Sequence, residues 1–471
     1  MILEIKDNYQ HCTKGCIEIC AVLTLKVVLK MVLNMNKVYF ITFGCKVSQY
    51  ETECMRSCFV SKGFGIAESE DEAKIFVINS CTVTGSGDKK SLYAVRRLRR
   101  FYPDSVIVLT GCLPQTNSEI REICPEADVI TGTKEREKIP ALVEKVISEK
   151  SCILHVPEFI SQEEFEDIHC DSSFNQTRAF MKIQDGCNCF CSYCIIPYAR
   201  GRCRSKPIES VKSEALRHAA AGHKEIVLVG INLAFYGMEY GLRLSDAVEV
   251  CCHTEGIERV RLGSIEPEML TDEDLQRLSA LPEFCPQFHL SLQSGSETVL
   301  KRMNRRYTPE EYMKIVENIR KYFPDAAFTT DVMVGFPEET EEEFAESVSF
   351  VEKVGFSAIH VFQYSPRKGT PAAAMKQIPQ KTKAERADRM KRAGYRLTEK
   401  YLKSLVGKTV PVLFERENSA DFHQGRAPDH TLIKVFRENS KKCLRNSILY
   451  VIIEECRGDY CIGRIADKNY T

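Results

Sequence analysis

The chain has 471 residues, of which 44% are hydrophobic and 28% are charged, and its 65 basic and 65 acidic residues give a formal net charge of zero. This length predicts several domains with ample buried core, and this composition excludes a disordered or fibrous protein. A zero net charge means that a nucleic-acid partner would have to be bound by local basic patches. The 22 cysteines are spread along the chain without a small-domain disulfide framework, which favours the reducing cytoplasm and metal clusters.

Residues 1–36 are interpreted as an N-terminal extension that precedes the fold and that a misassigned translation start would explain. Residues 16–35 are fairly apolar, but Glu18, Lys26 and Lys30 interrupt them. A membrane span needs about 20 mostly uncharged residues. We therefore expect no membrane association from this segment.

Residues 37–150 alternate between apolar strands and helices, which predicts an α/β domain with a parallel sheet. Strands are expected at 38–43, 75–79, 106–110 and 129–130, and helices at 48–63, 88–102 and 139–147. One cysteine follows each of the first three strands: Cys45, Cys81 and Cys112. Because ligands bind beyond the carboxyl ends of parallel strands, we expect these thiols to lie together and to hold a [4Fe–4S] cluster. The alternative is three unrelated core cysteines.

Residues 151–176 are acidic and irregular, and we interpret them as a linker or exposed loop. From 177 to 404, apolar strands alternate again with amphipathic helices. The strands are expected at 179–183, 225–229, 258–262, 287–292, 327–334 and 358–363. Six βα units predict an open, partial TIM-like barrel, in which chemistry takes place at the carboxyl ends of the strands.

A C-x3-C-x2-C spacing, formed by Cys187, Cys191 and Cys194, follows the first of these strands. Three thiolates this close can hold three irons of a cubane [4Fe–4S] cluster and leave the fourth iron open to a ligand. Buried or reactive thiols, or half of a zinc site, are the alternatives, but zinc sites usually close all four positions with pairs of C-x2-C. Cys189 fits no triple with this spacing and is interpreted as a bystander.

The chain ends in two further patterns. Residues 376–404 predict a strongly basic helix, which by default is a solvated helix face. Within residues 405–471, short alternating strands are expected at 409–415, 432–436, 447–454 and 462–464. They indicate a small antiparallel β-barrel.

These motifs together resemble the methylthiotransferases, a branch of the radical S-adenosylmethionine superfamily. The resemblance extends from residue 37 to residue 471 and is carried by "TFGCKVSQYETECM", "INSCTVT", "TGCLPQ", the cluster loop, "LVGINLAFYG", "RLGSIEP", "HLSLQSGSETVLKRMNRRY", "DVMVGFPEET" and "FQYSPRKGT". It implies two [4Fe–4S] clusters, S-adenosylmethionine as methyl donor and radical source, and a TRAM-like last domain that holds RNA. "GCKV" and "CTVT" resemble the branch acting on N6-threonylcarbamoyladenosine beside the tRNA anticodon, whereas Ser48, Ser80 and Cys189 depart from the usual pattern.

The resemblance also implies roles for individual residues. Cys187, Cys191 and Cys194 would hold the radical-generating cluster, and the other trio an auxiliary cluster. Five positions that follow barrel strands, and Asp331 within the fifth strand near the mouth, are candidates for the S-adenosylmethionine pocket, with a satisfied loop hydrogen bond as the alternative for each. The five are Gly230, Asn232, Ser264, Glu266 and Gln293. His289 is expected to be a packed core residue.

The expected partners are a tRNA anticodon stem-loop and an electron donor such as flavodoxin or ferredoxin. RNA contacts are expected from the basic helix, from the last domain and from basic residues of the first domain: Lys89, Lys90, Arg96, Arg97, Arg99 and Arg100. Two alternatives stay open. One is the same chemistry on isopentenyladenosine in tRNA or on a ribosomal-protein aspartate, and the other is a non-enzymatic iron–sulfur RNA-binding or redox sensor.

Overall fold

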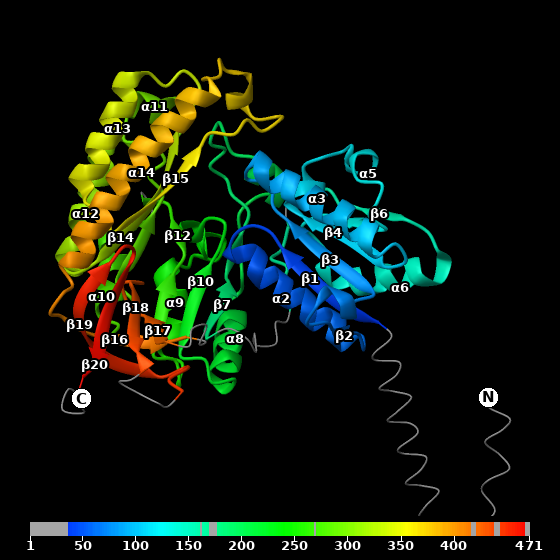
Figure 1. Cartoon of the computed structure of the whole chain (residues 1–471), viewed down its shortest axis with the longest axis horizontal. Coiled ribbons are helices and arrows are strands. Elements are labelled where there is room, and N and C mark those ends of the chain that lie inside the picture. The colour runs from blue at the N-terminus through cyan, green and yellow to red at the C-terminus, as the bar shows by residue number, and fades with distance from the viewer. Residues whose placement is uncertain are drawn as a thin grey trace, which may run out of the picture.

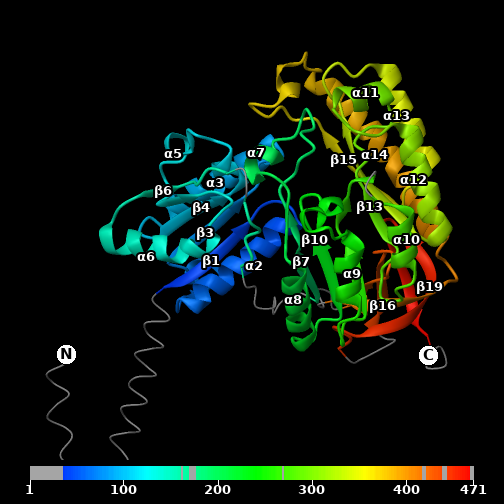
Figure 2. The same cartoon turned by 180° about the vertical axis from the view of Figure 1, so that it is seen from behind.

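The structure is a computed structural model that describes residues 36–160, 163–168, 177–267, 270–415, 421–437 and 443–466 (Figures 1 and 2). The expected N-terminal extension up to residue 35 and part of the expected linker lie outside these ranges. No helix within them is both long enough and apolar enough to cross a membrane.

The first domain is built on a six-stranded parallel sheet with the order β2-β1-β3-β4-β5-β6. Its strands are β1 (Lys37–Thr42), β2 (Gly65–Ile66), β3 (Ile75–Ser80), β4 (Val106–Gly111), β5 (Val129–Thr131) and β6 (Ile153–His155). Every residue of β3 is buried because helices cover both faces of the sheet. Helices α2 (Lys46–Ser61) and α6 (Ile139–Glu149) pack on one face, and α3 (Gly85–Phe101) packs on the other.

The interpretation of residues 151–176 as a linker or exposed loop is wrong at two points. Its residues 153–155 form β6 and extend the first sheet. Its acidic side chains are not simply exposed, because Glu163 pairs with Lys134, Glu166 with Arg136, and Asp167 with Lys206 at 2.7 Å. These pairs fasten the segment to the first domain and to the barrel that follows.

The central domain is the expected open barrel, divided into two parallel sheets with the orders β11-β10-β7 and β12-β13-β14-β15. Its strands are β7 (Arg178–Lys182), β10 (Glu225–Val229), β11 (Arg259–Leu262), β12 (Ser264–Ile265), β13 (Gln287–Leu290), β14 (Ala327–Val334) and β15 (Ala358–Gln363). The outer helices are α8 (Ile208–Ala220), α9 (Leu244–Cys252), α10 (Asp272–Ser279), α12 (Pro309–Tyr322) and α13 (Glu341–Val354). One continuous apolar core joins these strands and helices.

The basic helix α14 (Gln380–Lys403) runs along β15, and Figure 1 shows its lower end reaching the last domain. It is not solvated all round. Arg386 is buried and pairs with Glu339 at 2.7 Å, and Lys383 is buried against Tyr364. Part of its positive charge therefore anchors the helix to the barrel.

The last domain is a closed five-stranded barrel with the order β16-β17-β18-β20-β19. Its strands are β16 (Thr409–Phe414), β17 (Phe422–Arg426), β18 (Leu432–Phe436), β19 (Ile448–Arg457) and β20 (Tyr460–Ile465). All neighbours are antiparallel except β18 and β20, which pair in parallel. The predicted fold class, an α/β domain, a partial barrel and a small β-barrel, is confirmed, with this one parallel pair as a correction.

Candidate active site

The first cysteine trio lies at one edge of the first sheet. Strand β3 pairs in parallel with β1 and β4, so Cys45, Cys81 and Cys112 follow three adjacent strand ends. The turn before Cys45 lies close to the turn that holds Cys81, because a Cβ at Gly44 would lie 3.0 Å from the Cβ of Cys81. Gly44 also has φ +117°, which favours glycine. The structure thus brings together the three cysteines that the strand pattern predicted to meet.

The environment of this trio suits a metal cluster. Cys45 is exposed, Cys81 is half-buried and Cys112 is buried, and all three are free thiols. Burial raises the pKa of Cys112 to about 11 and also raises that of Cys81. These two thiols would therefore be neutral at pH 7, and a bound metal is the agent that would deprotonate them.

The second trio, Cys187, Cys191 and Cys194, lies in the loop between β8 (Gln184–Asp185) and α7 (Ile196–Arg200). The loop begins at Gly186, where φ is +71° and a Cβ would lie 1.9 Å from the carbonyl oxygen of Arg202. Only glycine fits there, so this residue fixes how the chain enters the loop.

Two polar side chains approach the sulfurs of this loop. Asn232 Nδ2 is 3.9 Å from Cys187 Sγ, and Arg305 Nη1 is 3.4 Å from Cys191 Sγ. Donors directed at thiolate sulfurs stabilise their charge and tune iron–sulfur centres. Arg305 also pairs with Glu266, through Nη1 at 3.1 Å. Asn232 and Glu266 therefore lie beside the loop, and their role towards a cofactor stays a prediction.

Cys189 is more involved than the spacing indicated. Its thiol interacts with Cys187, and this hydrogen bond lowers the pKa of Cys187 to about 7. Asn232 Nδ2 is also 3.5 Å from Cys189 Sγ. No local pattern indicates this interaction, because it depends on how the loop folds back.

The two trios belong to one region of the molecule. Helix α4 (Cys112–Gln115) begins with a cysteine of the first trio and packs against α7, which starts two residues after Cys194. A hydrogen bond of 2.7 Å from Thr133 Oγ1, in the segment after β5, to the Ala199 carbonyl also joins the first domain to α7.

Buried ion pairs hold this arrangement. Glu51 of α2 accepts Arg136 at 2.8 Å and Lys182 at 2.8 Å, and it also pairs with Arg200. Asp185, just before the cysteine loop, pairs with Lys182 at 2.6 Å. These contacts link the first domain to the barrel beside both trios, which fixes their relative positions.

Neither trio is built for a single ion. Within the described ranges, one group brings three ligand atoms within 4.8 Å of one another, and it consists of His289, Asp331 and His360. The alternative of a zinc site at the C-x3-C-x2-C loop therefore finds no support in the geometry.

A cavity of about 1000 Å³ lies between the three domains. Its wall includes Cys45 and Lys46 from the first domain, residues of the barrel strands, helix α14, and, from the last domain, Arg426 and residues 429–432. Of the predicted cofactor-pocket residues, Gly230, Ser264 and Asp331 line this cavity. Gln293 has φ +64° and joins β14 through its backbone, accepting from Met333 N at 2.8 Å.

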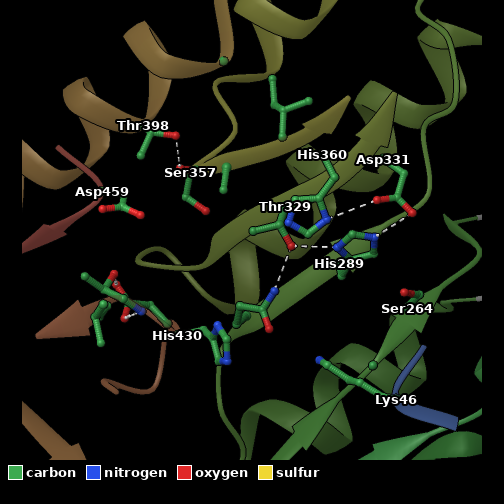
Figure 3. Close-up of a pocket in the computed structure, with 18 of the residues that line it drawn as sticks. Lys46, Ser264, His289, Thr329, Asp331, Ser357, His360, Thr398, His430 and Asp459 are labelled. Atoms are coloured by element: carbon green, nitrogen blue, oxygen red, sulfur yellow. Dashed lines mark hydrogen bonds and ion pairs between the residues drawn. The ribbon is translucent and has the colours of Figure 1, made fainter. Parts of the chain in front are cut away.

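The expectation that His289 is a packed core residue is wrong. It lines the cavity, where Nε2 lies 3.5 Å from Asp331 and Nδ1 lies 3.0 Å from Thr329 Oγ1 (Figure 3). His360 approaches the other oxygen of Asp331 at 3.3 Å. These two histidines lower the pKa of Asp331, against the effect of burial, so its carboxylate stays ionised. The alternation of Gln287 and His289 along β13 was the available signal for a lumen-facing histidine.

Comparisons with known proteins agree with this geometry. Residues 181–351 match the radical SAM superfamily, and residues 37–132 match the uncharacterized protein family UPF0004. Among solved structures, the radical S-adenosylmethionine methyltransferase TsrM from Kitasatospora setae superposes with a TM-score of 0.55 at 14% identity, covering 72% of this chain and 77% of that one. This likeness shows the fold alone and nothing about the substrate. The fold is that of a radical SAM protein.

Sequence relatives narrow the class. The threonylcarbamoyladenosine tRNA methylthiotransferase MtaB of Bacillus subtilis (strain 168) is 40% identical over 81% of this chain and 85% of its own length. The protein of the same name in Aquifex aeolicus (strain VF5) is 35% identical over 81% of this chain and 93% of its own. A tRNA-2-methylthio-N(6)-dimethylallyladenosine synthase of Caldicellulosiruptor saccharolyticus is 35% identical over 81% and 82%. The chain belongs to the tRNA methylthiotransferase family.

Proposed function

We propose that this protein transfers a methylthio group to C2 of N6-threonylcarbamoyladenosine beside the anticodon of tRNA. One observation carries the proposal: Cys45 of the first trio and Gly230, two residues before the Asn232 that approaches the second trio, line one cavity. The cavity thus contacts one proposed ligand of the first set and the strand end next to a residue that approaches the second set. A reaction that must combine a radical source, a sulfur donor and one purine carbon needs such a shared space.

The donor sets fit two [4Fe–4S] clusters. Cys187, Cys191 and Cys194 would hold one, and Cys45, Cys81 and Cys112 would hold the other. When bound, with S-adenosylmethionine on the first, these cofactors supply the radical, sulfur and methyl chemistry that no side chain can supply. The chain's own part is to orient them: Asn232 and Arg305 direct donors at the loop sulfurs, and the Glu51 ion pairs hold the two loops together.

The choice of threonylcarbamoyladenosine over isopentenyladenosine follows the most similar relatives, since four proteins of 35–40% identity carry the first name and others at 33–35% carry the second. The basic residues of α3, α14 and the last barrel would contact the stem-loop. A flavodoxin or ferredoxin as electron donor, and the cytoplasm as location, complete the proposal.

Two measurements test it. Anaerobically reconstituted wild-type protein should contain about eight irons, and a Cys45/Cys81/Cys112 triple alanine variant about four. That variant should still form 5′-deoxyadenosine from S-adenosylmethionine but no methylthiolated tRNA. Equal iron in both proteins would contradict the assignment of the first trio.

Substrate choice is tested by nucleoside analysis of tRNA from a deletion strain. The 2-methylthio form of threonylcarbamoyladenosine should disappear, while 2-methylthio-isopentenyladenosine stays. The reverse outcome would assign the protein to the isopentenyladenosine substrate. Absence of 5′-deoxyadenosine from the reduced wild-type protein would favour the non-enzymatic sensor.

A further inference from the structure

Lys46, at the start of α2 and next to Cys45, directs its side chain into the cavity. It lines the cavity wall, and Figure 3 shows it extending towards the side on which His430 lies. Among the contacts of the described residues, no hydrogen bond or ion pair engages its ammonium group. An unpaired cation beside a proposed cluster ligand needs an explanation.

The surroundings of Lys46 add positive charge rather than neutralise it. The positive charges of Arg178, Arg261 and Arg426 repel its ammonium group, and the carboxylate of Glu225 attracts it. Glu225 is engaged with Arg261 at 3.0 Å.

The only other carboxylate bound to this group in the described ranges, Glu415, pairs with Arg178 at 3.0 Å. Asp429, whose charge also acts on Arg261, accepts hydrogen bonds from Tyr401 and Thr431. Four positive side chains thus lie near three carboxylates.

A second observation marks the same place as an anion site. The Nε of Arg426 is buried without a hydrogen-bond partner, and Arg426 also lines the cavity. His430 does not supply a counter-charge, because a histidine is neutral or positive, and burial together with Arg261 lowers its pKa so that it stays neutral. Lys46 itself is exposed to the cavity, and a cavity wall with surplus positive charge is stabilised by an anion that enters with its ligand.

We propose that Lys46 binds the carboxylate of the N6-threonylcarbamoyl group and so selects this nucleoside over one with an uncharged N6 substituent. The inference rests on the proposed function. In an adenine ring, C2 and the carbon that bears N6 both flank N1, so a base whose C2 faces Cys45 carries its N6 group on the same edge. That group then extends into the cavity, where the Lys46 side chain points. An apolar dimethylallyl group would leave the ammonium unpaired.

Binding of synthetic anticodon stem-loops tests the proposal without turnover. Three are used: one with threonylcarbamoyladenosine, one with its carboxylate methyl ester, and one with unmodified adenosine. We expect wild-type protein to bind the acid about tenfold more tightly than the ester, since a charge-assisted hydrogen bond is lost. Lys46→Met should weaken binding of the acid about tenfold and leave binding of the ester unchanged.

Lys62→Met is the matched control. Lys62 caps the other end of α2 and is exposed outside the cavity, so its loss should change neither affinity. Iron content equal to that of wild type would show that the Lys46→Met protein is folded. If that variant fails to fold, the comparison of acid and ester on the wild-type protein still decides, and equal affinities would overturn the proposal.

The remaining outcomes distinguish a phosphate contact of Lys46, the proposed role of Lys46 and the proposed function of the protein. Equal weakening of acid and ester by Lys46→Met would mean that Lys46 contacts an RNA phosphate, which overturns the proposal. A wild-type protein that methylthiolates the acid stem-loop, together with unchanged binding by Lys46→Met, would overturn only the role of Lys46. A wild-type protein that never methylthiolates the acid stem-loop would instead overturn the proposed function.

Discussion

Glu51 is the single residue on which the alignment of the two cysteine trios most depends. Its carboxylate is 2% exposed and pairs with Arg136, Lys182 and Arg200. Burial alone would raise its pKa, but these three cations lower it to about 2. A carboxylate whose pKa is lower in the folded chain than in the unfolded chain stabilises the fold at pH values above its pKa in the unfolded chain.

We expect Glu51→Gln to lower the free energy of unfolding by roughly 3 kcal/mol at pH 7, because three buried cations lose their shared counter-charge. The pKa of a glutamate in the unfolded chain is 4.5, so the stabilisation is fully present above pH 4.5 and is lost as the pH falls towards about 2. The difference between variant and wild type in urea denaturation should therefore shrink over that window. Glu53→Gln, on the same helix with a looser Arg56 pair at 3.7 Å, should cost less than about 1 kcal/mol.

Some of the site's residues were predictable and others were not. The cysteine trios follow from spacing and from strand ends, both of which are local patterns. The Glu51 network was not predictable, because its partner Arg200 lies 149 residues away. Lys46 entered the sequence analysis only as part of the "GCKV" motif. Its lack of a counter-ion was not predictable, because the sequence does not show which side chains pair in the fold.

Among the elements, buried parallel strands were the easiest to predict. Strands β3, β10 and β14 are apolar runs between turn residues, and their bounds agree with the expected ones within a residue. Strand β17 (Phe422–Arg426) was missed because "FHQGR" alternates weakly and contains a glycine. Strand β6 was missed because three residues in an acidic segment give too short a pattern.

The turn between β14 and α13 supports the attachment of α14. Gly335 has φ +69°, its N–H donates to Glu339 at 2.8 Å, and a Cβ there would lie 2.5 Å from Cγ of Lys383. Glu339 in turn binds Arg386 of α14. Gly335 therefore makes the turn and also leaves room for α14.

We therefore expect Gly335→Ala to destabilise the protein by about 2–4 kcal/mol, from left-handed strain plus a clash with α14. Gly355→Ala is the matched control, because Gly355 has φ +73° but nothing within 4 Å of its added Cβ. It should cost only about 1 kcal/mol. Thermal unfolding of the two variants would measure the difference in their stability. Equal losses of stability would show that α14 shifts to accommodate the added methyl group.

At the scale of the whole molecule, the three domains meet around one cavity, and RNA has to approach it from the surface. The start of α3 lies beside Cys81 and is fixed against the segment after β15, where Arg367 donates to Thr82 at 2.7 Å. Three of the basic residues predicted for RNA contact are engaged within their own domain: Arg96 with Glu126, Arg97 with Glu70 and Arg99 with Asp128. Lys89 and Lys90, on the first turns of α3, are exposed.

We expect Lys89→Glu/Lys90→Glu to weaken binding of an anticodon stem-loop at low salt and to flatten the plot of log affinity against log salt by about 1.5, as two phosphate contacts are lost. The control is Lys321→Glu/Lys353→Glu, with the same charge change on α12 and α13, which Figure 1 shows on the opposite side of the barrel from α3. Acid and ester stem-loops should be affected equally by the α3 variant, because phosphate contacts do not read the N6 group. An equal effect of both double variants would mean that general charge, rather than the α3 surface, governs RNA binding.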